Sequence, residues 1–332
     1  MRFYQLSLLF TLIIISSCGG GSSSTEIEID SEVDSSDEPC INYQTSLGEG
    51  TTLNCRIVYD NVIRQFYIYL GSTYQSTSPV LFSLHGYTSR ALWNMNYTGF
   101  QSIADEFGFI VVYPQGTLLP ATGQTHWNVG GWTTSSITDD VGFLNEVIDF
   151  LDDEYSINLK RLYSTGMSNG GYMSYKLACD LSSRIAAVVS VTGSMTIETE
   201  EGCDPSHPTS VAQIHGLEDS VVSYYGNAFS KPIEEVMDYW VDHNNCSSEP
   251  NSSDIGGSNG GGIHDVYSGC DNQTSVELFL MNNMGHDWPN INDHDLQAST
   301  TIWDFLSAEA MEEEFMMYIL AAITKLVLNY SS

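Results

Sequence analysis

The segment from Leu162 to Leu177 constrains the fold more than any other part of the chain. It begins with apolar residues typical of a β-strand, continues through Gly-x-Ser-x-Gly at residues 166–170, and ends in a helix-like run. A serine in this setting sits on a sharp strand-to-helix turn that requires neighbouring residues without side chains. We therefore predict that Ser168 projects its hydroxyl from the edge of a β-sheet.

Short apolar segments alternate with helical segments through the body of the chain. We predict strands at residues 65–70, 79–84, 109–113, 162–165, 186–191, 211–215 and 276–281. A helix beginning near Asp139 and Asp140 carries its apolar residues on one face: Val141, Leu144, Val147, Ile148 and Leu151. The polar residues from Asn251 to Gly262 are expected to form a loop. The alternation favours an α/β fold with a mostly parallel central sheet and helices on both faces.

Two residues that follow other predicted strands suit a reaction at Ser168. A serine hydroxyl is a weak nucleophile, so it needs a base and an acidic residue that orients the base, in the chain order Ser, acid, His. Asp219 follows the strand at 211–215, and His286 follows the strand at 276–281. We predict that His286 accepts the proton of Ser168 and that Asp219 fixes the tautomer of His286.

Other acidic and histidine residues near these strand ends are alternatives. Glu218 is adjacent to Asp219 and is the competing acid. His85 and His215 are interpreted as buried structural residues, because they lie at strand ends. His294 lies in a polar loop whose acidic residues also suit a hard cation such as calcium. We expect a solvated loop there and predict no metal site.

Attack by a serine on an acyl group produces an oxyanion that needs two backbone N–H donors. One donor is expected to be the amide of Asn169, which follows the nucleophile. The second is expected in the loop after an early strand. The strand at 79–84 runs into His85, Gly86 and Tyr87, and we predict the amide of Tyr87 as the second donor.

Five motifs in a fixed order resemble a known family. They are His85-Gly86, Asp139-Asp140-Val141-Gly142-Phe143-Leu144, Gly166-Met167-Ser168-Asn169-Gly170-Gly171, His215-Gly216-x-x-Asp219 and Gly285-His286-x-Trp288-Pro289. Together they resemble the secreted esterases grouped as polyhydroxybutyrate depolymerase-like and as feruloyl or acetylxylan esterases. The resemblance covers about residues 65–306. It implies an α/β-hydrolase fold, a carboxylic-ester substrate, no cofactor and a triad of Ser168, Asp219 and His286.

Three tryptophans in predicted loops are candidates for substrate binding: Trp93, Trp132 and Trp288. An aromatic face suits a feruloyl ring or a sugar ring, and an apolar slot suits a hydroxybutyrate chain. Trp288 is the strongest candidate, because it is two residues from His286. A role in packing is the alternative for each of them.

The chain contains seven cysteines, and six remain when Cys18 is set aside. An even number of cysteines in an exported protein favours disulfides. Local spacing favours three pairs, which are Cys40 with Cys55, Cys179 with Cys203 and Cys246 with Cys270. A zinc site is disfavoured, because the sequence contains no Cys-x-x-Cys pair.

The two ends of the chain differ from its body. Residues 1–17 resemble a lipoprotein-type signal peptide, in which Cys18 becomes the lipidated first residue; an ordinary secretory signal is the alternative. Residues 18–39 form an acidic Gly/Ser-rich tether. Residues 40–307 form the catalytic domain, and residues 308–332 form an apolar helical extension. We expect an outer-membrane or cell-surface lipoprotein, or an extracellular protein.

The charge of the chain excludes some partners. It carries 42 Asp and Glu against 10 Lys and Arg, a net charge of -32. Such a surface repels nucleic acid and anionic lipid, so we expect membrane contact only through a lipid anchor. The predicted function is hydrolysis of feruloyl or acetyl esters on a polysaccharide. The alternatives are a polyhydroxybutyrate depolymerase, a serine peptidase and a non-catalytic glycan-binding lipoprotein.

Overall fold

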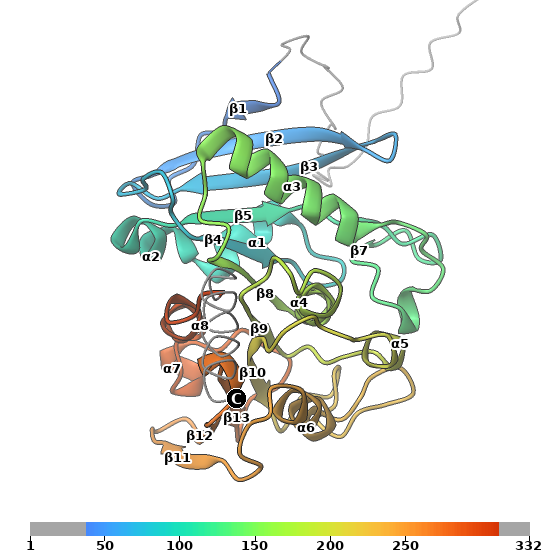
Figure 1. The fold of residues 1–332 in the computed structure, drawn as a ribbon, viewed down its shortest axis with the longest axis vertical. Helices are drawn as coiled ribbons and strands as arrows, with labels where there is room; N and C mark the ends of the chain where they lie inside the picture. The colour runs from blue at the N-terminus through green and yellow to red at the C-terminus, as the bar shows by residue number, and fades with distance from the viewer. Residues whose placement is uncertain (1–37, 312–332) are drawn as a thin grey trace, which may run out of the picture. The chain divides into compact units, whose positions relative to one another are not determined.

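The computed structural model describes residues 38–311 of the 332-residue chain. The predicted signal peptide, the lipidation site at Cys18, nearly all of the tether and the C-terminal helix therefore lie outside the described residues. The described part begins with β1, which starts two residues after Glu38, and ends shortly after α8 (Figure 1).

The described residues form an 11-stranded sheet in the order β1-β2-β3-β5-β4-β8-β9-β10-β13-β12-β11. Its strands are β1 (Cys40–Asn42), β2 (Thr51–Tyr59), β3 (Val62–Leu70), β4 (Val80–Leu84), β5 (Ile110–Pro114), β8 (Leu162–Met167), β9 (Ala187–Val191), β10 (Ser210–Gly216), β11 (Asn251–Ile255), β12 (Gly262–Tyr267) and β13 (Val276–Met281). The central strands from β5 to β13 run parallel, and the strands at both ends are antiparallel. A separate hairpin pairs β6 (Thr117–Leu118) with β7 (Thr125–His126).

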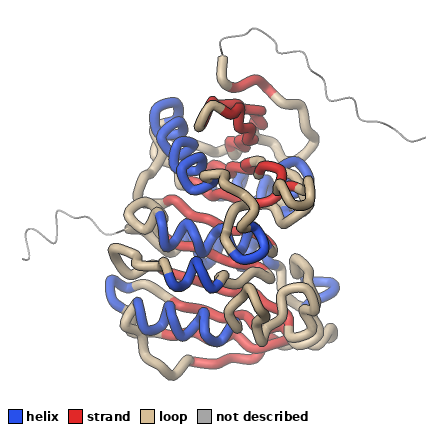
Figure 2. The backbone as a smooth tube through the Cα atoms, turned by 90° about the vertical axis from the view of Figure 1, so that its right-hand side faces the viewer, coloured by secondary structure: helices blue, strands red, loops and turns tan. Residues whose placement is uncertain are grey.

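Helices cover both faces of the sheet (Figure 1), and Figure 2 shows those packed along one face. They are α1 (Ala91–Thr98), α2 (Phe100–Phe107), α3 (Asp140–Tyr155), α4 (Asn169–Asp180), α5 (Ile197–Glu201), α6 (Ile233–His243), α7 (Ile291–His294) and α8 (Ala298–Ser307), with short 3-10 turns η1 (Gly131–Thr133) and η2 (Asp271–Gln273). One apolar core contains residues of α3, α4 and α6, and the other contains residues of α1, α2 and α8. The predicted two-sided α/β architecture is confirmed.

The predicted strands agree closely with the observed ones, and one predicted loop is wrong. Every residue of β4, β5, β9 and β10 is buried, which explains why their sequences are mainly apolar on both faces. The predicted loop from Asn251 to Gly262 instead contains β11, which pairs with β12 in an antiparallel hairpin. The side chains of β11 are almost all exposed. Its strand conformation therefore depends on backbone pairing rather than on burial, and leaves no apolar pattern in the sequence.

The start of α3 explains the paired aspartates of the sequence. Asp139 is the N-cap, and its side chain accepts a hydrogen bond from the amide of Gly142 at 2.8 Å. Asp140 is buried and lies 2.7 Å from Arg64 of β3 in an ion pair. Asp139 also accepts the hydroxyl of Tyr59 of β2 at 2.5 Å, so both aspartates secure α3 to the sheet.

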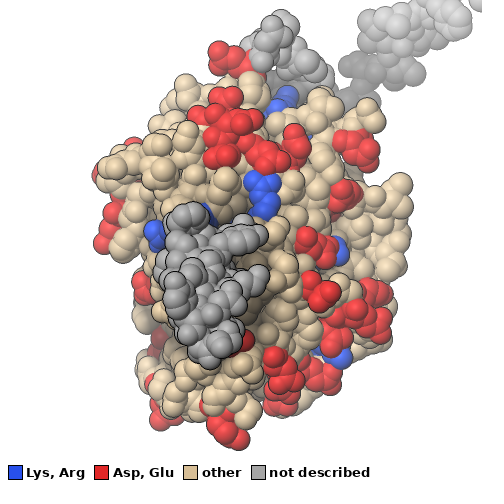
Figure 3. All heavy atoms as spheres, viewed as in Figure 1, with Lys and Arg blue, Asp and Glu red and all other residues tan. Residues whose placement is uncertain are grey.

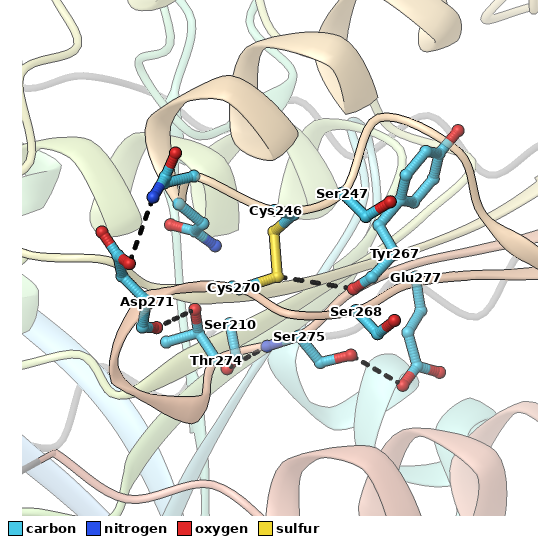
Figure 4. The surroundings of a disulfide bond; sticks show 12 residues. Ser210, Cys246, Ser247, Tyr267, Ser268, Cys270, Asp271, Thr274, Ser275 and Glu277 are labelled. Carbon is cyan, nitrogen blue, oxygen red and sulfur yellow. Dashed lines mark hydrogen bonds between the residues drawn. A yellow bond between two sulfur atoms is a disulfide. The ribbon is translucent and has the colours of Figure 1, made fainter.

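The three predicted disulfides are confirmed, and each one joins neighbouring elements. Cys40 pairs with Cys55 across β1 and β2, and Cys179 of α4 pairs with Cys203. Cys246 and Cys270 join the chain after α6 to the chain before β13 (Figure 4). Disulfides of this kind are typical of proteins in oxidising compartments, so they fit an exported protein.

Acidic side chains are spread over the face of the molecule seen in Figure 3, with few basic side chains among them. Within residues 38–311, ion pairs with carboxylates are made by Arg64, Lys176, Arg184 and Lys231, among others. Within residues 38–311, no helix has the length and apolar character needed to cross a membrane.

Candidate active site

Ser168 occupies the turn between β8 and α4 in a backbone conformation that few residues adopt. Its φ is 55° and its ψ is −123°. The glycines around it allow this turn, because a Cβ on Gly166 would lie 2.5 Å from the carbonyl carbon of Gly170. A Cβ on Gly170 would in turn lie 2.2 Å from the carbonyl oxygen of Leu84. The Gly-x-Ser-x-Gly sequence thus allows a close approach of β4, β8 and α4 that holds Ser168 in a strained turn.

Asp219 and His286 form a hydrogen-bonded pair at the carboxyl edge of the same sheet. His286 Nδ1 lies 2.8 Å from Asp219 Oδ2, and the imidazole is 19% exposed. The other carboxylate oxygen of Asp219 accepts the amides of Val221 and Val222 at 2.9 and 2.8 Å. Burial alone would raise the pKa of Asp219, but the bonds from His286 and these amides lower it below its ordinary value. Asp219 is therefore an ionised acceptor that fixes the orientation of His286.

The order of the strands brings the three residues to one edge. Ser168 follows β8, Asp219 follows β10 and His286 follows β13, and these strands run parallel within four consecutive positions of the sheet. The amide of Ser168 donates to the carbonyl of Val191 at 2.8 Å, which ties the turn to the end of β9. Among residues 38–311, the hydroxyl of Ser168 makes no hydrogen bond, so it is available to a base or a substrate.

The loop after β4 lies beside the serine turn. A Cβ on Gly86 would lie 3.6 Å from the Cβ of Ser168. The amide of Asn169 is at the first position of α4, where a helix N–H has no partner within the helix. In the described part of the chain, the amides of Tyr87 and Asn169 donate no hydrogen bond to another residue. Both remain candidates for the oxyanion donors.

The side chain of Asn169 has a role that the sequence analysis did not predict. It is fully buried, accepts the amide of Trp127 at 2.7 Å and donates to the carbonyl of Trp127 at 3.1 Å. Trp127 in turn donates its indole N–H to the carbonyl of His85 at 2.9 Å. These bonds connect the start of α4 to the loop after β4. The only signal in the sequence was the position of Asn169 in the motif.

His85 and His215 are buried and use both ring nitrogens within the protein. His85 Nε2 accepts the amide of Gly116 at 3.0 Å, and its Nδ1 lies 2.8 Å from the carbonyl of Gly86. Burial lowers the pKa of His85 to about 4. His215 contacts Gln213 and the carbonyl of Val222, both at 2.9 Å, and burial likewise lowers its pKa. The structural interpretation of both residues agrees with this geometry.

The three candidate tryptophans lie in different environments. Trp288 is only 5% exposed, packs edge-on against Phe100 and donates its indole N–H to Ser299 at 3.1 Å. Its ring faces the core, so we do not include it in a substrate site. Trp132 is half-buried and packs against Tyr172 of α4. Trp93 is 62% exposed on α1.

The loop that carries His286 is fixed by a tyrosine that the sequence analysis missed. Tyr97 of α1 donates its hydroxyl to Asp287 Oδ1 at 2.7 Å and accepts the amide of Trp288 at 3.2 Å. Burial, followed by the bond to Asp287, raises the pKa of Tyr97 to about 12. No local pattern relates two residues that are 190 positions apart.

The polar segment around His294 is committed to internal contacts. Asp295 accepts the amides of Asn259 at 2.7 Å and Gly261 at 3.1 Å, which fixes the turn between β11 and β12. His294 Nε2 lies 3.7 Å from Asp287 Oδ2. In the part of the chain that the structure describes, no group of three or more His, Cys, Asp or Glu side chains is arranged to hold a metal ion.

Comparison with known proteins identifies similar enzymes, although no family model matches the chain. The chain is 26% identical over 246 residues to a bifunctional acetylxylan esterase/xylanase of Neocallimastix patriciarum, over 74% of this chain and 33% of that protein. It is 29% identical over 228 residues to feruloyl esterase B of Piromyces equi, over 65% of this chain and 41% of that protein. The chain thus spans well under two thirds of the length of these curated relatives.

Solved structures give the fold. An acetyl xylan esterase from Aspergillus awamori aligns with a TM-score of 0.56 and 14% identity, over 78% of this chain and 99% of that one. A likeness at this level of identity concerns the fold and not the substrate. Together with the mostly parallel sheet and the serine turn after β8, it gives the chain an α/β-hydrolase fold, and its relatives in sequence are feruloyl and acetylxylan esterases.

Proposed function

We propose that the protein is a serine carboxylic-ester hydrolase whose catalytic residues are Ser168, His286 and Asp219. The observation that carries the proposal is the strained backbone of Ser168, at the same sheet edge as a buried Asp219 that is bonded to His286. A nucleophile on such a turn, a base with one ring nitrogen unused and an ionised orienting acid are the three parts that acyl transfer requires.

The reaction proceeds in two steps. Ser168 Oγ attacks the ester carbonyl carbon while His286 Nε2 takes the serine proton. The carbonyl oxygen becomes an oxyanion that accepts hydrogen bonds from the amides of Tyr87 and Asn169. The intermediate then collapses, and the alcohol leaves with the proton from His286. Water, deprotonated by His286, hydrolyses the acyl-enzyme, and the acid is released as Ser168 regains its proton.

The substrate class follows from the relatives and from the charge. Their names refer to feruloyl esters and to acetylated xylan, so we propose feruloyl or acetyl esters on a polysaccharide as the substrate. A net charge of -32 favours a polymer without negative charge. No cofactor takes part in the proposed reaction. Neither relative is named for activity on polyhydroxybutyrate, which therefore serves as a comparison substrate.

One set of assays tests the function. Hydrolysis of p-nitrophenyl acetate, methyl ferulate, acetylated xylan, polyhydroxybutyrate film and casein is measured with the full chain and with Ser168→Ala. We expect ester hydrolysis by the wild type, highest on the feruloyl or acetyl substrates, and its loss in Ser168→Ala. Ester hydrolysis that survives in Ser168→Ala contradicts the assignment of the nucleophile. Preference for casein or for the polyester film assigns a peptidase or a depolymerase instead, and binding without turnover assigns a glycan-binding protein.

We also propose that residues 40–307 form the catalytic domain and that the chain is anchored through a lipid on Cys18. The support for the anchor is the apolar segment that ends in Ile15-Ser16-Ser17-Cys18. Cys18→Ala is expected to move the protein from the membrane fraction to the soluble fraction of an expressing bacterium. A variant that stays in the membrane fraction contradicts the anchor and makes residues 315–328 the next segment to delete.

A further inference from the structure

Helix α1 lies between the two halves of the proposed catalytic machinery. The helix begins at Ala91, just after the loop that contains Tyr87, and the amide of Ala91 donates to Gln115 Oε1 at 3.0 Å. In its middle, Asn94 donates to the carbonyl and to the hydroxyl of Ser83 on β4, both at 3.0 Å. Near its end, Tyr97 is bonded to Asp287, the residue after His286. The helix thus connects the loop with the proposed oxyanion donor to the loop with the proposed base.

The outer face of α1 carries two aromatic rings. Trp93 is 62% exposed and Tyr97 is 51% exposed, while Asn94 and Met95 between them face the core. Residues four apart lie on the same side of a helix, with Cβ atoms about 5–6 Å apart. Asn96, which is also exposed, adds an amide to this surface. The two rings therefore form a short aromatic stripe, Trp93 and Tyr97, that leads to the loop of His286.

Each ring is held by a polar partner. The guanidinium carbon of Arg90 lies 5.6 Å from the centroid of the Trp93 ring, within the range of a cation–π contact. The hydroxyl of Tyr97 is fixed by its bonds with Asp287 and with the amide of Trp288. Exposed side chains that are already held in place lose less entropy when a ligand binds. Two exposed rings held in fixed orientations are more typical of a binding surface than of incidental surface residues.

The charge around the stripe selects against anionic ligands. Asp287 borders the stripe with a half-exposed carboxylate, and the guanidinium of Arg90 lies at the other end, against Trp93. The whole chain carries a net charge of -32, so a polyanion is repelled at long range before it reaches the stripe. A neutral chain of sugar rings has apolar ring faces for the aromatic side chains and hydroxyls for Asn96 and Asp287, without this repulsion.

We propose that Trp93 and Tyr97 are a stacking subsite for a neutral, xylan-type sugar chain that carries the ester bond to Ser168. This inference deepens the proposed function and rests on it for the placement of the ester. It assigns the polymer to the surface of α1. Since the exposed parts of both rings would contact the polymer and not a small ester, the subsite contributes to polymer affinity more than to the reaction of a small ester.

Calorimetric titration of the full chain with xylohexaose, which has no ester to hydrolyse, tests the subsite without relying on turnover. We expect Trp93→Ala and Tyr97→Ala to weaken binding about 10-fold each, or about 1.4 kcal/mol. Tyr97→Phe keeps the ring and loses the bond to Asp287, so it is expected to retain most of the affinity. Phe107→Ala is the matched control, because Phe107 is 54% exposed but ends α2 three residues before β5, at the opposite edge of the sheet. It is expected to bind like the wild type.

Two results with xylohexaose would overturn the proposal. One is a wild-type protein that does not bind xylohexaose, and the other is an unchanged dissociation constant in Trp93→Ala. Hexagalacturonate at low salt is expected to bind at least about 10-fold more weakly than xylohexaose, and equal binding refutes the neutral ligand. Loss of ester hydrolysis with intact xylohexaose binding would reject the proposed function alone. If the proposed function and the subsite are both correct, Trp93→Ala is expected to lower kcat/KM on acetylated xylan about 10-fold more than it lowers kcat/KM on p-nitrophenyl acetate.

Discussion

Three histidines lie at the carboxyl ends of parallel strands, and only one of them has a ring nitrogen free for chemistry. His85 after β4 and His215 in β10 are fully buried, and each uses both nitrogens in bonds to nearby groups. His286 after β13 is 19% exposed and uses Nδ1 on the carboxylate of Asp219. All three histidines therefore share a position at the sheet edge. Their hydrogen-bond partners are what distinguish the two structural histidines from the proposed base.

The partners also determine the charge that each histidine can take. Burial lowers the pKa of His85 and of His215, so both stay neutral through the physiological range. His286 instead contacts a carboxylate whose pKa is lowered, which would stabilise the imidazolium in the proposed acyl transfer. An ionised acid beside a partly exposed ring is the difference that makes one histidine suitable as a base.

The largest expected effect comes from exchanging the two kinds of histidine. His286→Gln is expected to lower kcat by about 10⁶-fold with little change in melting temperature, because it removes the base from the proposed site. His215→Gln is expected to lower stability by about 1–3 kcal/mol, because it disturbs buried hydrogen bonds, while activity per folded molecule stays within about 10-fold. Activity on p-nitrophenyl acetate and thermal unfolding are measured on both. Equal losses of activity in the two variants would show that the distinction between the histidines is wrong.

The second effect concerns the acid that orients His286. Asp219→Asn is expected to lower kcat by about 10⁴-fold, because an amide nitrogen can donate to Nδ1 and hold the wrong tautomer. Glu218→Gln is the matched control, since Glu218 is adjacent but exposed, and it is expected to change kcat by less than about 3-fold. Steady-state kinetics on one small ester compares them. A larger loss in Glu218→Gln than in Asp219→Asn would transfer the role to Glu218.

The smallest effect is a dependence of stability on pH. The folded pKa of His85, about 4, is below its unfolded value of 6.5, so the unfolded chain binds the extra proton between these pH values. The free energy of unfolding is therefore expected to fall as pH decreases from 6.5 to 4, by up to about 1.4 kcal/mol per pH unit from this residue. Urea unfolding of wild type and His85→Gln at several pH values measures the difference. Parallel curves would argue against a neutral buried His85.

Much of the central sheet and the proposed triad could be predicted from the sequence, for physical reasons. The predicted strands 211–215 and 276–281 match β10 and β13 closely, because strands inside a parallel sheet are mainly apolar on both faces. The serine turn is recognisable in the sequence, because the close approach of the backbones excludes any side chain at Gly166 and Gly170 and so requires glycine there. Asp219 and His286 then follow from chain order and from the shared edge of parallel strands.

The features that could not be predicted from the sequence depend on the direction of a side chain or on the pairing of strands at the edge of the sheet. Trp288 is two residues from His286, yet its ring points into the core against Phe100. The strand β11 has exposed residues on both sides, so its polar sequence resembles a loop. Tyr97 and Asp287 meet only because α1 passes beside the loop after β13, which no periodic pattern encodes.

The central claim is that Ser168 is the nucleophile of an acyl-transfer site, and covalent labelling tests it most directly. The full chain is treated with a p-nitrophenyl alkylphosphonate, which transfers its phosphonyl group to an activated serine, and the adduct is located by peptide mass spectrometry. We expect one adduct per chain, on the peptide that contains Ser168, together with loss of ester hydrolysis, and much slower labelling in His286→Gln. An adduct on another residue, or full inactivation without an adduct on Ser168, would contradict the account.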